Sequence, residues 1–321
     1  MKSFNIPILF IVFNRPDTTS EVLNEIRKIK PQFLYIASDG PRNQNLDEIK
    51  RCEAVREIIK NGITWECEVI RLYQTKNLGC GKAVSTAITW FFQHVEQGII
   101  LEDDCVPNTS FFSFCKEMLE KYKYNENIYS ITGQNIQFGR NYNNDSYFYS
   151  KYLYIWGWAT WRRAWEKYDF DMQDWPEFKE KKLDVVLNYK VDQIEYWKKN
   201  LDAFYKNEVD SWDYQFLFTI WKNSALTIVP NKNLISNIGF REDATHTVTS
   251  NHRLSNLPTF ELSNISHPKN IVINTKADDY FFYNVLNYSH TTNLFLKILR
   301  KLKIYLKNIH VNALRNSNTC L

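Results

Sequence analysis

The chain has 321 residues, of which 44% are apolar and 16% aromatic, so it can bury the core of one large domain or of two fused subdomains. Six basic residues and no acidic ones follow Asp279. Without these six, the 40 basic residues become 34 against 36 acidic ones, so the rest of the chain has a net charge of −2. This charge argues against nucleic acid as a partner. The six cysteines lack a Cys-x-x-Cys spacing, which argues against structural zinc and favours reduced thiols in a cytoplasmic protein.

The first apolar run, at residues 6–13, superficially resembles an export signal. It is short, contains Pro7 and has no small-residue cleavage site, so we predict a β-strand instead. No segment is long enough to span a bilayer as a helix, and we expect no transmembrane segment.

Apolar runs then alternate with amphipathic segments. Thr18-x-x-Glu21 predicts the capping-box start of a helix. The further predicted elements are a strand at 33–37, a helix at 47–60, a strand at 68–73, a helix that opens in the loop 77–82, a strand at 99–101 and a helix at 111–122. This alternation predicts an α/β fold with a mostly parallel sheet and helices on both of its faces.

Polar residues follow each of the four predicted strands. Arg15, Asp39, the loop 77–82 with Lys82, and the triplet Glu102-Asp103-Asp104 all stand at such positions. Because the carboxyl ends of parallel strands meet at one edge of a sheet, we expect these groups to line one crevice. Together they suit a nucleoside diphosphate with a metal ion. Gly-x-x-x-x-Gly-Lys-Ser/Thr and Gly-x-Gly-x-x-Gly are absent, which argues against a P-loop and a dinucleotide cofactor.

The triplet at residues 102–104 is the strongest single signal in the chain. Adjacent carboxylates repel one another, and burying them together is costly unless a cation neutralises them. A hard divalent metal with a phosphate partner would do so. The alternative is a solvated acidic turn leading into the next helix, with Asp104 near the helix N-terminus.

The second half is markedly aromatic, with tryptophans at 156, 158, 161 and 165 in KYLYIWGWATWRRAW. Such side chains pack in cores, but Trp and Tyr also stack on sugar rings. Gly157, between two tryptophans, predicts a close approach of the backbone to another group.

The stretches PILFIVFNRP, YIASDG, IILEDDCVPNTSFFSFC, YIWGWATW and SWDYQF with LTIVPN occur in this order over residues 6–246. As an ordered set they resemble GT-A fold glycosyltransferases, specifically the N-acetylglucosaminyltransferase I family and bacterial sugar transferases of similar layout. The resemblance implies inverting transfer from a nucleotide sugar, usually a uridine diphosphate (UDP) sugar, with an Asp-x-Asp-like motif and Mn²⁺ or Mg²⁺. It implies a nucleotide-sugar-binding half at 1–106, an acceptor-binding half at 107–275 and a tail at 276–321.

The resemblance also implies roles for individual residues. Arg15 and Asp39 match residues that contact the uracil, Asp103 matches one that reaches the ribose, and Asp104 matches the direct metal ligand. Glu102 completes the triplet on the nucleotide-sugar side. Asp213 matches the Asp-Asp pair near the family's catalytic base, although here Tyr214 replaces the second Asp.

An inverting transfer needs a carboxylate near the acceptor hydroxyl as general base. We predict Asp213 for this role, with Asp210 as the second choice; the alternative is that Asp213 is a helix N-cap or turn acid before an apolar run. His246, in a polar loop, either completes the metal site or is simply an exposed histidine. Arg241 either holds phosphate or is solvated.

The tail at 294–309 has an apolar arc opposite Lys and Arg residues. It predicts a helix that either lies on an anionic membrane or packs on the body. Membrane binding would favour a lipid-linked acceptor at the cytoplasmic face, as in surface-polysaccharide assembly. The competing functions are a sugar-phosphate nucleotidyltransferase, which expects a Gly-rich loop after the first strand, and a noncatalytic sugar- or membrane-binding protein.

Overall fold

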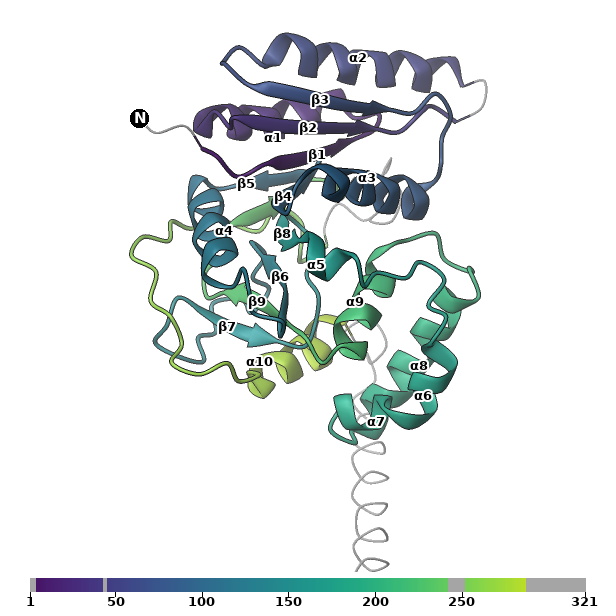
Figure 1. Cartoon of the computed structure of the whole chain (residues 1–321), viewed down its shortest axis with the longest axis vertical. Coiled ribbons are helices and arrows are strands. Elements are labelled where there is room, and N and C mark those ends of the chain that lie inside the picture. Colours follow the sequence, from purple (N-terminus) through teal and green to yellow (C-terminus); the bar gives the residue numbers. More distant parts are fainter. Residues whose placement is uncertain (1–3, 43–44, 242–251, 287–321) are drawn as a thin grey trace, which may run out of the picture.

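The computed structural model describes residues 4–42, 45–241 and 252–286. Its main feature is a sheet in the order β3-β2-β1-β4-β8-β6-β9-β7, beside a small sheet of β10 and β5 (Figure 1). The strands are β1 (Ile8–Val12), β2 (Phe33–Ser38), β3 (Glu68–Tyr73), β4 (Gln97–Glu102), β5 (Cys105–Pro107), β6 (Ile128–Thr132), β7 (Tyr147–Ser150), β8 (Trp158–Trp161), β9 (Leu226–Pro230) and β10 (Ile235–Asn237). The helices are α1 (Pro16–Ile29), α2 (Leu46–Gly62), α3 (Cys80–His94), α4 (Thr109–Lys121), α5 (Arg162–Trp165), α6 (Trp175–Lys181), α7 (Leu183–Val186), α8 (Val191–Tyr205), α9 (Asp213–Lys222), α10 (Thr275–Tyr280) and the π-helix η1 (Phe281–Leu286).

The large sheet has a parallel half and a mixed half. Strands β3, β2, β1 and β4 are parallel, and Phe10 of β1 pairs with Ile36 on one side and Leu101 on the other. Strand β8 runs antiparallel to β4 and β6, β9 runs parallel to β6, and β7 closes the sheet antiparallel to β9. The carboxyl ends of β1, β2 and β4 therefore lie along one edge, as the sequence predicts.

Alternation along the strands supplies a core on each face of the sheet. Ile8, Phe10 and Val12 of β1 belong to a buried cluster with α1, α2 and α4. Leu9, one residue out of step, belongs to a second cluster with α3 and the later helices. Helices α6, α7 and α8 gather beside α9, away from the parallel half (Figure 1). The predicted α/β fold with helices on both faces is confirmed.

The first helix begins earlier than predicted. Helix α1 starts at Pro16, Arg15 is its N-cap without a side-chain capping bond, and Thr18 lies inside the helix. The predicted capping box at Thr18 is therefore wrong. Proline fixes φ in the helical range and lacks the N–H that a first turn leaves unpaired, so Pro16 provides the start instead.

Most of the tryptophans pack in the core. Trp158, Trp161 and Trp165 are buried, and Trp158 stacks on Trp212 with ring centroids 5.4 Å apart. Gly157 has φ +60°, and a Cβ there would lie 2.4 Å from the Ile235 side chain. The close approach that Gly157 predicts is thus to β10 of the protein itself.

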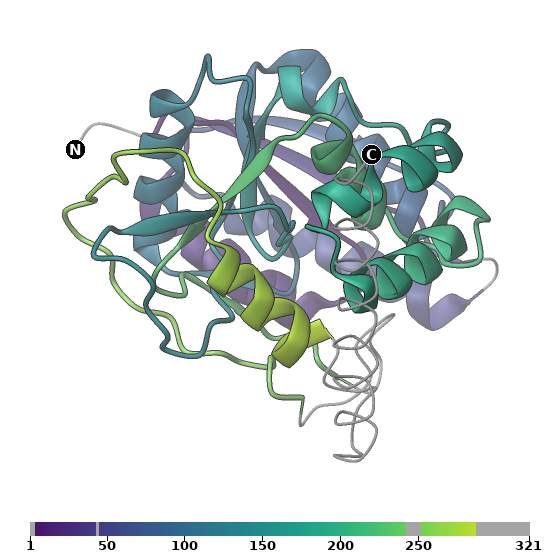
Figure 2. The ribbon, with the colours of Figure 1, turned by 90° about the horizontal axis from the view of Figure 1, so that it is seen from below.

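The sheet crosses the boundary expected after residue 106, because β4 pairs with β8. Helix α10 begins at the other expected boundary, and its Ala277 and the following Phe282 are fully buried. Seen from below, α10 and η1 lie across the mixed half (Figure 2). Within 4–42, 45–241 and 252–286, no helix is long and apolar enough to cross a membrane. The tail helix predicted at 294–309 lies outside the described residues.

Candidate functional site

A cavity of about 500 Å³ opens at the carboxyl ends of β1, β2 and β4. It is lined by six of the predicted site residues, from segments far apart in the sequence: Arg15, Asp39, Glu102, Asp103, Asp104 and Asp213. Lys82 is exposed on α3 and does not line the cavity. His246 lies outside the described residues. The sequence therefore brings most of the predicted site together, through the parallel sheet.

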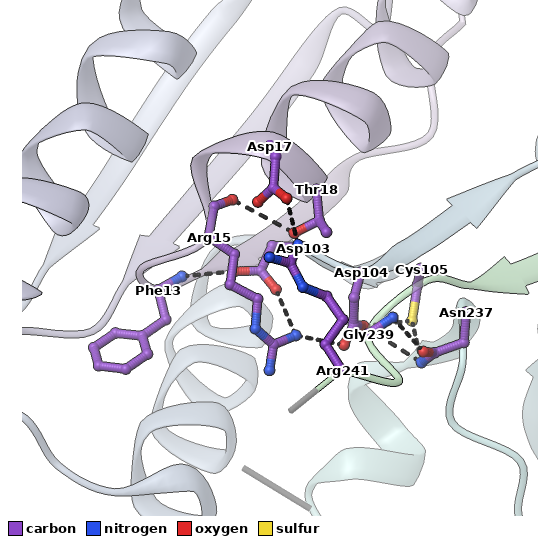
Figure 3. A network of polar contacts seen from close by, with 10 residues as sticks. All are labelled: Phe13, Arg15, Asp17, Thr18, Asp103, Asp104, Cys105, Asn237, Gly239 and Arg241. Atoms are coloured by element: carbon purple, nitrogen blue, oxygen red, sulfur yellow. Dashed lines mark hydrogen bonds and ion pairs between the residues drawn. The ribbon is translucent and has the colours of Figure 1, made fainter. Parts of the chain in front are cut away.

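Four carboxylates, which we call the acidic wall, face this cavity: Glu102, Asp103, Asp104 and Asp213. Arg15 lies between two of them (Figure 3). Its Nη1 is 2.7 Å from Asp104 Oδ2 and 3.6 Å from Asp103 Oδ1. The backbone N–H of Phe13 donates to Asp103 Oδ2 at 3.0 Å. The end of β1 thus fixes two neighbouring acids with one cation and one amide.

The small sheet also holds Asp104 in place. The N–H of Ile238 donates to the Asp104 carbonyl at 2.9 Å, and Asn237 Nδ2 lies 3.5 Å from Oδ1. A Cβ on Gly239 would lie 2.0 Å from Asp104 Oδ2, so a larger residue there would displace the carboxylate. Sequence reasoning missed Asn237 and Gly239 because the pairing of β10 with β5 has no signature in the local pattern.

The charges of the acidic wall act on one another. Burial, followed by repulsion from Asp104, Asp103 and Asp213, raises the pKa of Glu102. Burial also raises the pKa of Asp103, and the guanidinium of Arg15 opposes that rise. Burial lowers the pKa of Arg15, but the adjacent carboxylates more than offset this and its pKa is raised. The wall therefore carries more negative charge than is easily accommodated at a buried site.

The acidic wall can be tested for its fit to Mn²⁺ or Mg²⁺. Among the described residues, no group of three or more His, Cys, Asp or Glu side chains is placed to hold a metal ion by itself. Mg²⁺, however, is usually bound through one or two carboxylates, with water and substrate phosphates as the other ligands. The crowded negative charge suits such an ion. The residues therefore fit a metal that shares a diphosphate, and Asp104 is the described residue that would hold it.

Asp39 holds the loop between β3 and α3. Asn77 Nδ2 donates to Asp39 Oδ2 at 2.8 Å, and the N–H groups of Gly40 and Leu78 donate to Oδ1 at 2.8 and 3.1 Å. Burial raises the pKa of this carboxyl, although these amide bonds oppose the shift. Asp39 thus shapes its part of the cavity through its own loop contacts.

The start of α3 differs from the predicted phosphate-binding loop. The N–H groups of Cys80 and Gly81 donate to the carboxylate of Asp210, at 2.9 and 2.8 Å. A protein carboxylate therefore takes the place of the expected anionic ligand at this helix N-terminus. Asp210, the second choice for the base, has both oxygens committed there.

Asp213 is the first residue of α9 and also lines the cavity. The N-cap of this helix is Trp212, so Asp213 is not the N-cap that the alternative predicts. Ser211 Oγ donates to Asp213 Oδ1. Trp156, Trp212 and Tyr214 line the cavity as well, and Trp156 is only partly buried. The cavity therefore joins an acidic wall to an aromatic side.

Two further side chains bear on the chemistry of the site. Arg241 pairs with Asp17 of α1, next to Arg15 (Figure 3). Cys80 lines the cavity, and burial raises the pKa of its thiol, so this thiol stays protonated and is a poor nucleophile.

No protein-family model and no curated protein matches the sequence. Among solved structures, apo UDP-glucose pyrophosphorylase aligns at 10% identity and TM-score 0.36, over 70% of this chain and 90% of that chain. Mouse xyloside xylosyltransferase 1 aligns at 13% identity and TM-score 0.35, over 67% and 81%. HddC from Yersinia pseudotuberculosis aligns at 10% identity and TM-score 0.32, over 54% and 86%. At TM-scores of this size, these similarities carry no argument about function.

Proposed function

We propose that this protein is a glycosyltransferase that moves a sugar, with inversion, from a nucleoside diphosphate sugar to an acceptor hydroxyl. The observation that carries the proposal is the acidic wall with Arg15, gathered in one cavity at the carboxyl ends of parallel strands. This is where open α/β sheets bind their ligands. A UDP sugar is the proposed donor, on the strength of the sequence resemblance at Arg15 and Asp39.

The chain's own residues supply the binding and proton-transfer groups. Asp213 accepts the proton of the acceptor hydroxyl while that oxygen bonds to the anomeric carbon and the bond to the diphosphate breaks. Arg15, between Asp103 and Asp104, offers positive charge within the wall. Asp103 is the proposed contact to the ribose, on the strength of the sequence resemblance. A Mn²⁺ or Mg²⁺ ion held at Asp104 would neutralise the charge that develops on the departing diphosphate.

The acceptor is proposed to be a glycan or a lipid-linked saccharide. Trp156 and Tyr214 form part of the aromatic side of the cavity, and aromatic faces suit sugar rings. The basic tail lies outside the described residues. Its sequence is the basis for proposing that the protein binds peripherally to an anionic membrane surface on the cytoplasmic side, where surface polysaccharides are assembled. His246 remains a proposed metal or diphosphate contact.

The structure weighs against the sugar-phosphate nucleotidyltransferase alternative at one point. That reaction was expected to need a Gly-rich, Arg-containing loop after the first strand. Here β1 ends at Val12 and α1 starts at Pro16, which leaves only Phe13, Asn14 and Arg15 between them.

The test is a panel of nucleotide sugars incubated with the full chain, an acceptor mixture and Mn²⁺ or a chelator. Released nucleoside diphosphate is measured, and NMR reports the anomeric configuration of the product. A parallel reaction with added pyrophosphate is assayed for nucleoside triphosphate. We expect inverted product and free nucleoside diphosphate, dependent on metal and lost in Asp104→Ala. Asp174→Asn, which changes an exposed acid paired with Lys222, is the matched control.

Each rival gives a different result in the same assay. Conversion of a nucleotide sugar and added pyrophosphate to nucleoside triphosphate and sugar 1-phosphate would identify a nucleotidyltransferase. Binding of sugars without turnover of any donor would identify a noncatalytic protein. Retained configuration would contradict Asp213 as a base in a single displacement.

A further inference from the structure

Asp210 joins two parts of the cavity that are far apart in the sequence. It lies between α8 and α9, 130 residues after Cys80, whose N–H it accepts at 2.9 Å through Oδ2. Its Oδ1 accepts the N–H of Gly81 at 2.8 Å. Helix α3 has no side-chain cap from its own N-cap residue, Gly79. Asp210 therefore caps α3 from a distance, and its charge suits the positive end of the helix dipole.

The glycines around this contact leave room for it. A Cβ on Gly79 would lie 2.7 Å from Asp210 Oδ2, and one on Gly81 would lie 2.8 Å from Oδ1 and 2.7 Å from the Ser211 carbonyl oxygen. Gly79 also has φ +80°, which favours glycine. The Gly-Cys-Gly sequence thus fits the approach of the 210–211 backbone.

The same short segment carries the acid proposed as base. Ser211 Oγ donates to Asp213 Oδ1, and Gln215 Nε2 donates to the Ser211 carbonyl at 2.9 Å. Asp210 is thus bonded to α3, and Ser211 is bonded to the first turn of α9. The position of Asp213 relative to the rest of the acidic wall depends on both connections.

The connection continues to the nucleoside end of the cavity. Asn77 and Leu78, just before Gly79, are bonded to Asp39 at the end of β2. A continuous set of hydrogen bonds therefore runs from Asp39 through the start of α3 to Asp210.

We propose that Asp210 is a positioning residue, which holds Asp213 at its working distance from the donor by fixing the 210–213 segment to α3. The effect of Asp210 on catalysis rests on the proposed function, but the attachment of the 210–213 segment to α3 does not. Asp210 is not the base, because both of its oxygens accept backbone amides.

The test variant is Asp210→Asn, which keeps the size of the side chain but places an amide NH₂ against one of two N–H donors. We expect kcat for sugar transfer to fall about 10-fold or more, whereas the Kd for UDP with Mn²⁺ changes less than about twofold. The pH–rate profile should keep its ascending limb, because Asp213 still ionises. Asp174→Asn should match the unchanged protein in all three.

Hydrogen exchange gives a readout that needs no turnover. In Asp210→Asn we expect the amides of Cys80 and Gly81 to exchange about 10-fold faster or more, together with amides at 212–215, whereas those of β1 stay as they were. Unchanged exchange in both segments would overturn the proposal. A second result would also overturn it: the ascending limb of the pH–rate profile is lost in Asp210→Asn but kept in Asp213→Asn. That result would make Asp210 the base.

The two proposals fail in distinguishable ways. If the unaltered protein transfers no sugar, the proposed function falls, and the exchange data still decide whether Asp210 holds the 210–213 segment. If transfer occurs and Asp210→Asn retains full kcat, the positioning role is wrong while the function stands.

Discussion

The carboxylate of Asp278 in α10 and those of the acidic wall lie in different surroundings. Asp278 Oδ1 accepts from Ser150 Oγ at 2.5 Å, Oδ2 accepts from the N–H of Lys151 at 3.2 Å, and the charge of Lys151 lies nearby. In the wall, like charges adjoin one another and raise the pKa of Glu102. Asp278 is held by donors from β7 and the residue after it, whereas Glu102 in the wall has three further carboxylates whose charges raise its pKa.

This comparison predicts that changes in the wall alter turnover and changes at Asp278 alter stability. A wall variant that alters only stability, or an Asp278 variant that alters only turnover, would contradict the comparison. The predictions below run from the largest expected effect to the smallest.

Asp213→Asn should lower kcat by about 10²- to 10⁴-fold, because it removes the group proposed to accept the proton. Donor binding, measured by calorimetry with UDP and Mn²⁺, should change little. The unfolding midpoint should not fall, because the change removes one of several repelling charges. A full kcat would exclude Asp213 as the base, and a large loss of stability would make it a structural acid like Asp278.

Asp278→Ala should lower the free energy of unfolding by roughly 1–3 kcal/mol for each donor it leaves unpaired, Ser150 Oγ and the Lys151 N–H. Urea unfolding measures the loss. Well below the unfolding transition, kcat should match that of the unaltered protein. Reduced kcat in the fully folded variant would show that α10 contributes to the cavity after all.

The pH dependence of stability should also report Asp278. Burial raises its pKa to about 6 in the folded state, above the unfolded value of about 3.9. The folded state therefore binds the extra proton between these values, and stability falls as pH rises from about 4 to 6, by up to about 3 kcal/mol from this group.

The measurement is the difference in unfolding free energy between the unaltered protein and Asp278→Asn, taken from pH 4 to 7 by urea unfolding. Taking the difference removes the contributions of other acids. A difference that stays constant over this range would show that Asp278 is charged throughout.

Trp156→Ala should have the smallest effect and tests whether the aromatic side belongs to the functional region. We expect the acceptor KM to rise about 2- to 10-fold with kcat nearly constant, the size expected for one aromatic stacking contact. Trp158→Ala is the matched core control, and it should instead lower stability by about 3–5 kcal/mol. Equal losses of stability in both variants would assign Trp156 to the core.

The parallel half of the sheet was largely predictable. Its strands and helices have the local periodicities of such elements, and the predicted strand at 68–73 matches β3 as observed. The position of Arg15, Asp39 and the triplet at strand ends then places them at one edge by topology alone. The start of α1 was misjudged because Pro16 outweighed the Thr-x-x-Glu pattern.

Contacts within the site were less predictable. Lys82 stands after a strand end, as the other predicted nucleotide-sugar-binding residues do, yet it is exposed on α3 and does not line the cavity. Asn237 and Gly239 contact Asp104 only because β10 pairs with β5. Such contacts depend on the packing of distant segments, and no local pattern encodes them.

The sequence by itself determined the order of strands and helices in the first half and the residues that follow each strand, because periodicity and turn chemistry act over a few neighbouring residues. Only the tertiary structure decided that Asp210 caps α3 and that its carboxylate takes the place of the anionic ligand expected there. It also decided that Asp278 is buried beside hydrogen-bond donors. Those outcomes depend on charge and hydrogen-bond partners separated by more than a hundred residues, which meet only when the sheet and its helices have packed.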